Sequence, residues 1–117
     1  MATKYAGSPK ASPAPRAKAP EPVLETRETV LPKLIAEFTG TYILVLTVGC
    51  NVLGGASVWA VTSIAASLMV MIFALGPISG AHLNPAVTLA VVISNKMQSG
   101  VKVALQYVLV QLTAGVC

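Results

Sequence analysis

Ionisable side chains are scarce in this 117-residue sequence. Only 10% of its residues are charged, whereas 55% are hydrophobic and the mean hydropathy is +0.75. Soluble domains carry about 25% charged residues, so this composition indicates a membrane protein. Six of the eight lysines and arginines lie at or before Lys33. The net charge of +4 therefore describes a tail and one loop rather than a nucleic-acid-binding surface, and no nucleic-acid partner is expected.

The residues that perform covalent and metal chemistry are also few. The chain has two cysteines and one histidine. Cys50 lies inside an apolar run and Cys117 is the last residue, which gives neither a metal-binding spacing nor a disulfide framework. Inside the apolar region, Glu37 and His82 are the only candidates for a catalytic group. We therefore predict no catalytic residue, no metal site and no cofactor, and the protein is not expected to be an enzyme.

The first thirty residues differ in composition from the rest of the chain. They are rich in alanine, proline, serine and lysine, and the first apolar run begins only at about Leu31. Such a segment cannot bury enough apolar surface to offset the entropy that it would lose on ordering. We expect a disordered arm over residues 1–30, followed by a membrane unit over residues 31–117.

Three apolar runs are candidates for transmembrane helices. They cover about residues 34–53, 58–76 and 101–117. Basic residues precede the first and third runs, and the turn between the first two carries no charge. The positive-inside rule therefore places the N-terminus and the loop around Lys96 in the cytoplasm. The sequence predicts an all-α, multi-pass membrane protein, and it does not indicate which membrane.

The segment between the second and third runs, about residues 77–94, is predicted to re-enter the membrane. A Gly-Pro pair ends the second apolar run, and Asn84-Pro85 is a favoured start for a new helix. The apolar helical pattern then extends only to Ile93, which corresponds to roughly 14 Å. That length is about half of a ~30 Å hydrocarbon core. A helix this short fits a membrane only when it is buried in protein or lines a wet cavity.

The polar run before this short helix predicts a path for small neutral solutes. Extended backbone over residues 78–83 would leave carbonyl oxygens that need water or a permeant as partners. A row of such acceptors can pass small hydrogen-bonding molecules. The amino end of the helix adds about half a positive charge, which repels cations. The Asn84 side chain supplies a further donor or acceptor at the same point.

The ten residues 79–88, SGAHLNPAVT, resemble the first signature loop of the aquaporin and glyceroporin family, the major intrinsic proteins. The resemblance extends to AEFTGT at residues 36–41, and to Tyr107, Gln111 and Gly115. It implies the first repeat of an aquaporin-like fold, with three transmembrane helices and one re-entrant half-helix. It also implies passive transport of water or small uncharged solutes across a lipid bilayer. The full-length protein would be a homotetramer.

The resemblance assigns roles to individual residues. Asn84 would be the pore-lining asparagine of the first N-P-A motif. The other candidates are Pro85 and Ala86 in that motif, Gly80, Ala81 and His82 as pore-lining carbonyls, Glu37 and Gln111 as braces of the loop, and Ile64 at the second-helix position of the constriction filter.

Plainer interpretations of the same residues remain open. Asn84 would serve as a helix cap, Gln111 as a helix-packing hydrogen bonder, and Ile64 as an ordinary packing residue. Glu37 would extend to the interface one turn from Lys33. An aliphatic Ile64 also departs from the bulky aromatic that is usual in water-selective members, so the resemblance does not imply strict water selectivity.

Family members resemble two inverted repeats, and only the first is present in this sequence. The second N-P-A motif and the filter arginine are absent from it. We therefore do not expect this chain alone to conduct. The alternative functions are a non-conducting fragment, and a structural or regulatory subunit that associates with full-length relatives.

Overall fold

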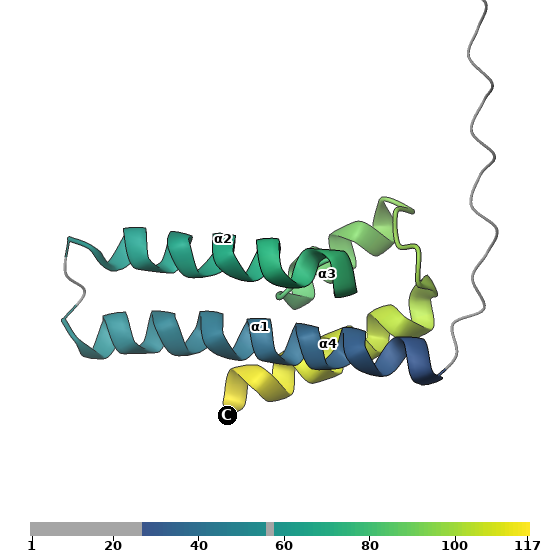
Figure 1. Ribbon diagram of the computed structural model, residues 1–117, viewed down its shortest axis with the longest axis horizontal. Helices are drawn as coiled ribbons and strands as arrows, with labels where there is room; N and C mark the ends of the chain where they lie inside the picture. The colour runs from purple at the N-terminus through teal and green to yellow at the C-terminus, as the bar shows by residue number, and fades with distance from the viewer. Residues whose placement is uncertain (1–26, 56–57) are drawn as a thin grey trace, which may run out of the picture.

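The computed structural model describes residues 27–55 and 58–117, which form helices and contain no strand (Figure 1). The all-α prediction is therefore confirmed for this part of the chain. Two of its helices, α1 and α2, are long and apolar enough to cross a membrane. Most of the expected disordered arm lies outside the described residues. The elements are α1 (Arg27–Leu53), α2 (Ala60–Ser79), α3 (Pro85–Ile93) and α4 (Gly100–Val116).

Helix α1 begins before the apolar run that marks it in the sequence. Its first residue is Arg27, so Arg27 to Val30, expected to belong to the arm, are helical instead. Pro32 lies in the second turn, where its missing N–H removes a single backbone hydrogen bond. The apolar composition indicates only the part of α1 that can lie in lipid, and the helix begins before that part.

Helices α1 and α2 lie side by side as an antiparallel pair, joined at one end by a short turn (Figure 1). A polar seam links them in the half nearest this turn. Asn51 donates through Nδ2 to Ser63 Oγ at 2.8 Å, and Thr47 Oγ1 donates to Ser67 Oγ at 3.3 Å. Hydrogen bonds between transmembrane helices typically stabilise their association by about 0.6 kcal/mol each. The sequence pattern did not single out these four residues.

The shorter apolar helix α4 packs against α1, and α3 packs against α4 alone among the described helices. Small side chains permit the close approach of α1 and α4. Ala36, Ala104 and Ala114 are buried there, with exposed fractions between 1% and 4%. The largest fully buried side chains are polar or aromatic: Tyr107, Gln111, Glu37 and Thr88. The interior of this fold is therefore a hydrogen-bonded cluster surrounded by small residues.

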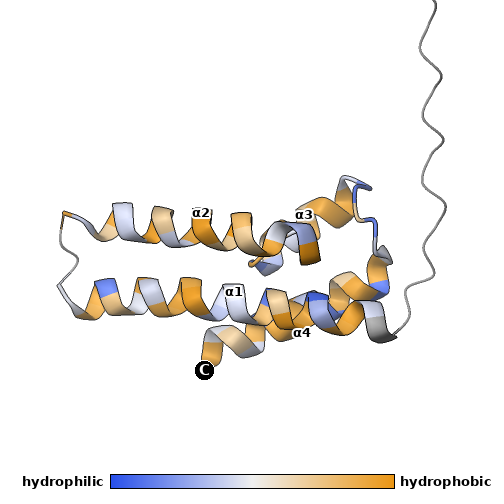
Figure 2. Ribbon diagram, viewed as in Figure 1, coloured by the Kyte–Doolittle hydropathy of each residue, from blue (hydrophilic) through white to orange (hydrophobic). Residues whose placement is uncertain are grey.

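Most residues of the helices are apolar (Figure 2), and many of the large apolar side chains are exposed. On α2, Val61, Met69 and Phe73 are 77%, 67% and 87% exposed. Contiguous apolar surface of this kind marks contact with lipid or with another protein. The structure therefore has the reverse arrangement of a soluble bundle, with polar groups gathered inside.

The connection between α2 and α3 differs from the sequence prediction. Helix α2 continues through Gly76 and Pro77 to Ser79, because Pro77 removes only one donor and transmembrane helices tolerate that loss. The non-helical loop is correspondingly short, comprising residues 80–83. It is not extended, since Gly80, Ala81 and Leu83 have φ angles of +89°, +47° and +50°.

Candidate functional site

Glu37 is the centre of the candidate site. Its side chain on α1 is 0% exposed, and its carboxylate accepts four hydrogen bonds. A carboxylate offers about four lone-pair positions, so this acceptor capacity is fully used. The donors are Ser79 Oγ (2.7 Å) and the His82 N–H (2.9 Å) to Oε1, and the Leu83 N–H (2.7 Å) and Gln111 Nε2 (2.8 Å) to Oε2.

All four donors are neutral groups, and two of them belong to the backbone of the loop. Burial of a carboxylate is costly unless hydrogen bonds compensate for the lost water, and here they do. The N–H groups of residues 82 and 83 point toward α1 and so fix the loop against it. Glu37 and Gln111 were both predicted from the sequence to brace the loop. In the structure they are in direct contact, because Gln111 donates to the same Glu37 oxygen that accepts the Leu83 N–H.

Ser79 and Tyr107 secure the start of the loop. Ser79 Oγ accepts a hydrogen bond of 3.0 Å from the Ala81 N–H while donating to Glu37. The Tyr107 hydroxyl on α4 donates to the Ser79 carbonyl oxygen at 2.9 Å. The end of α2 is therefore held from both α1 and α4.

Thr88 secures the other side of the loop. This residue of α3 is 1% exposed, and its hydroxyl accepts a 3.0 Å hydrogen bond from Gln111 Nε2. His82 Nδ1 lies 3.2 Å from the same hydroxyl, and the His82 ring stands edge-on to Tyr107 with centroids 5.5 Å apart. The His82 side chain thus packs within the cluster, with no second histidine, cysteine or acid grouped with it as a metal site among the described residues.

Asn84 begins α3. Its Oδ1 accepts a 2.8 Å hydrogen bond from the Ala86 N–H, and Pro85 occupies the first turn. The Asn84 side chain is exposed, and its amide nitrogen has no hydrogen-bond partner within the described residues. The structure therefore shows a helix cap whose donor face is free. The carbonyl oxygens of Gly80, Ala81 and His82 likewise accept no hydrogen bond from the residues that the structure describes.

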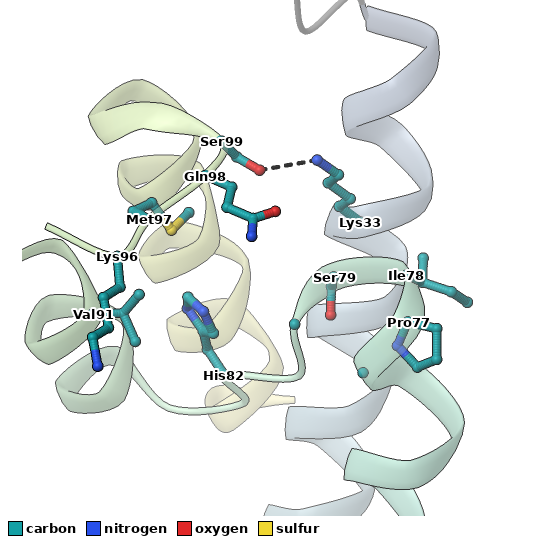
Figure 3. A pocket seen from close by; sticks show the side chains of 12 residues that line it. Lys33, Pro77, Ile78, Ser79, His82, Val91, Lys96, Met97, Gln98 and Ser99 are labelled. Carbon is teal, nitrogen blue, oxygen red and sulfur yellow. Dashed lines mark hydrogen bonds between the residues drawn. The ribbon is translucent and has the colours of Figure 1, made fainter. Parts of the chain in front are cut away.

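A cleft of about 410 Å³, here called the Lys33 cleft, adjoins this loop. Its walls include Gly80, His82 and Lys96. Figure 3 shows Lys33 reaching from α1 to Ser99, to which its Nζ donates a 2.9 Å hydrogen bond, with the His82 ring rising from the loop below them. The loop therefore borders a polar cleft.

Comparison with known proteins identifies the family. The profile described as "Major intrinsic protein" matches residues 25–117. The chain belongs to the major intrinsic protein family. The resemblance drawn from residues 79–88 is thereby confirmed, and with it the aquaporin-like fold class. Major intrinsic proteins are integral membrane channels and not enzymes, which also bears out the expected absence of enzymatic function.

Among curated members of this family, aquaporin NIP1-1 of Arabidopsis thaliana is 46% identical over 86 residues, which covers 62% of this chain and 27% of that protein. Aquaporin NIP1-1 of Oryza sativa subsp. japonica is 44% identical over 71 residues, covering 50% of this chain and 23% of the relative. The matched part of the chain thus spans about a quarter of the length of these relatives. No solved structure matches the chain.

Ile64, the predicted filter residue of this family member, lies apart from the loop. It stands fifteen residues before Ser79 on the same helix, which corresponds to about 22 Å along α2. It is half-buried beside Ser63, one of the α2 residues that bond to α1. Asn84, Glu37 and Gln111 are therefore gathered by the fold, whereas Ile64 is not.

Ser79 and Thr88 belong to the family signature, yet sequence reasoning gave neither of them a role. One signal was present: Thr88 is a polar residue on an otherwise apolar helix, four residues after Asn84, so the two share a helix face. The same spacing separates Tyr107 from Gln111 on α4. Polar residues on otherwise apolar helices, such as Thr88, Tyr107 and Gln111, indicate buried polar contacts.

Proposed function

We propose that the loop, together with α3, forms one wall of a pore for water or small uncharged solutes. The observation that carries the proposal is that the loop's N–H groups are hydrogen-bonded to described residues of the protein whereas its carbonyl oxygens are not. The N–H groups of His82 and Leu83 are consumed by Glu37, whereas the carbonyl oxygens of residues 80–82 and the Asn84 amide nitrogen have no partner in the described chain. Unpaired polar groups at membrane depth require water or a permeant.

The selectivity proposed for this wall follows from charge. The amino end of α3 carries a partial positive charge and presents the Asn84 amide beside it. A cation approaching this point would be repelled. A neutral molecule that both donates and accepts hydrogen bonds would instead exchange its hydrogen bonds to water for hydrogen bonds to the loop carbonyl oxygens and the Asn84 amide. Ile64 is proposed as part of the filter further along the path, where an aliphatic side chain leaves room for solutes larger than water.

The proposed topology places the N-terminus in the cytoplasm. Lys33 and Lys102 both stand near the beginnings of their helices, and Lys96 lies in the connection before α4. A Lys33 hydrogen bond to Ser99 joins the first of these helices to that connection, so the cationic residues gather at one end. Under the positive-inside rule that end is cytoplasmic. Residues 31–117 would be the membrane unit, with residues 77–94 entering from this side.

A second candidate function is that of a subunit that conducts only within a larger assembly. Helix α3 packs against α4 alone, and the Asn84 side chain is exposed. This leaves the opposite side of the proposed path uncovered by the described residues. A second half-helix would complete the pore, and homotetramers of complete pores are the proposed final assembly.

Thiol labelling tests the pore wall in proteoliposomes that also contain a cysteine-free full-length aquaporin, which can supply the second half-helix that encloses the path. Cys50 and Cys117 are first replaced by serine, and a single cysteine is then placed at Ala86. Ala86 is exposed beside the proposed path, so a membrane-impermeant maleimide added from the cytoplasmic side should modify Ala86→Cys. Phe73→Cys is the matched control, because Phe73 is 87% exposed on the apolar surface of α2 and should stay unmodified in lipid. Equal labelling at the two positions would refute the proposal.

Stopped-flow swelling of proteoliposomes separates the two candidate functions. The purified chain alone should add no water or glycerol flux above that of empty vesicles, because one wall does not enclose a path. Flux from the chain alone would instead show that copies of this polypeptide complete the pore themselves. In that case the need for a different second half-helix would be disproved.

A further inference from the structure

A second cleft lies between the beginnings of α1 and α4, and we call it the Lys102 cleft. Its volume is about 630 Å³, within the roughly 300–1,000 Å³ of ordinary ligand sites. Ser99 borders both this cleft and the Lys33 cleft, so the two are neighbours. An apolar wall is formed by Val30, Leu31 and Leu34 on α1. A polar rim is formed by Ser99, Lys102 and Gln106 beside and on α4, where Val103 also lines the cleft.

The charge at this rim is positive and uncompensated by any acidic side chain that the structure describes. Lys102 is exposed, and the one described acidic side chain, Glu37, is buried with all its acceptor positions occupied. Ser99 precedes α4 without a side-chain capping hydrogen bond. The first N–H groups of α4 therefore lack a cap and add a partial positive charge to the same rim.

The apolar wall sets the second requirement on an occupant. Leu31 is 59% exposed, and Val30 and Leu34 are half-buried beside it. These residues extend about 6 Å along α1, as Lys102 to Gln106 do along α4. That depth suits the top of an acyl chain and its glycerol, and it is too short for a docked helix of several turns. A free phosphate would leave the leucines uncovered.

We propose that the Lys102 cleft binds one anionic phospholipid, with the phosphate at Lys102 and the uncapped start of α4 and the upper acyl chain against Val30, Leu31 and Leu34. Basic pockets between transmembrane helices are recognised sites for anionic headgroups. The proposal does not depend on the pore, because none of these residues belongs to the loop or to α3.

Native mass spectrometry of the purified full chain in detergent micelles tests the proposal. Phosphatidylglycerol is the probe, and phosphatidylcholine with the same acyl chains is the neutral reference. The chain should retain phosphatidylglycerol in preference to phosphatidylcholine. Lys102→Gln should weaken its binding about fivefold, the change expected from one lysine near an anionic headgroup, and should leave phosphatidylcholine unchanged. Lys102→Arg should keep the preference, which separates loss of charge from loss of fold.

Two further variants locate the site. Lys96→Gln is the matched charge control, because Lys96 is an exposed lysine that borders the Lys33 cleft instead, and it should bind phosphatidylglycerol as the parent chain does. Leu31→Trp keeps the charge and fills the apolar wall, so it should reduce bound phosphatidylglycerol several-fold. Equal effects of Lys96→Gln and Lys102→Gln, or full binding by Leu31→Trp, would overturn the proposal.

Other occupants give their own readings in the same experiment. Displacement of phosphatidylglycerol by an equal concentration of free glycerol 3-phosphate would mean that the cleft holds only the phosphate. A dimer that excludes lipid and disappears in Leu31→Trp would mean that a second copy covers the apolar wall. Either result would overturn the lipid assignment.

Discussion

The backbone N–H of Leu83 donates a 2.7 Å hydrogen bond to Oε2 of Glu37, a residue 46 positions earlier in the chain. Gln111 on α4 donates to the same oxygen at 2.8 Å. One carboxylate therefore joins two long helices to the loop that precedes α3. The geometry of the proposed pore wall depends on this buried acid, even though the acid itself has no contact with the proposed path.

Replacement of Glu37 by Gln should destabilise the fold. The amide would present an N–H₂ group to two donors that now meet a carboxylate oxygen. Unmatched buried donors cost about 1–3 kcal/mol each, so we expect the two to lower the unfolding free energy by roughly 2–6 kcal/mol. Denaturation by sodium dodecyl sulfate, followed by far-ultraviolet circular dichroism, measures the loss. Thr39→Ala changes an exposed residue on the same helix and should alter stability little; equal losses would contradict this account.

Two glycines of α1 should respond in opposite directions to the same substitution. A methyl group at Gly40 would overlap the Leu83 side chain and lie 2.8 Å from Leu75 Cδ1. Gly40→Ala should therefore cost about 1–3 kcal/mol by overpacking. At Gly49 the added carbon would meet no described atom within 4 Å beyond its own stretch of helix, so Gly49→Ala should raise stability by up to about 1 kcal/mol through helix propensity. The same denaturation assay compares them, and a loss in both would argue against close packing at Gly40.

The stability of the fold should increase when Thr41 loses its hydroxyl group. The side chain is 4% exposed, and Oγ1 has no hydrogen-bond partner among the described residues. Valine has nearly the same shape and no buried polar atom to leave unsatisfied, so Thr41→Val should gain about 1 kcal/mol. Thr41→Ser, which keeps the hydroxyl and loses a methyl group, should show no gain. A destabilised valine variant would reveal a partner for this hydroxyl.

The polar seam between α1 and α2 should show pairwise coupling. A double-mutant cycle with Asn51→Ala and Ser63→Ala isolates their 2.8 Å hydrogen bond. Cycles of this kind in membrane helices give about 0.6 kcal/mol, with a maximum near 1.7 kcal/mol, and we expect a value in that range. Asn51→Ala combined with Thr62→Ala, at an exposed neighbour on α2, should be additive. Additivity in the first cycle would mean that the seam contributes nothing to the pairing.

The sequence carried most of the information on where helices form. Helix α3 occupies Pro85–Ile93, because an Asn-Pro start and a polar stop are local signals that need no tertiary support. Glu37 drew attention as a charge inside an apolar run, since such residues require partners. Both signals act over a few residues, which is why they can be recognised without a structure.

Other features depend on distant parts of the chain. Ala81 and Leu83 adopt positive φ angles that their residue types disfavour, and the Glu37 hydrogen bonds to residues 82 and 83 hold them there. No pattern in residues 80–83 specifies that shape. The end of α2 was likewise misplaced because Pro77, usually a sign that a helix stops, sits where α1 and α4 together support one more turn through Ser79.

Glu37 holds the loop by bonding to the main chain of residues 82 and 83. The side chains at these two positions are therefore comparatively free to vary. His82 and Leu83 reach Glu37 with amide groups that every amino acid except proline possesses. Relatives can therefore exchange either side chain, subject to the space beside Gly40 and Tyr107, without detaching the segment from its anchor. Side-chain identity should therefore matter most at Glu37 and at Ser79 and Gln111, which reach it through their side chains, and less at His82 and Leu83.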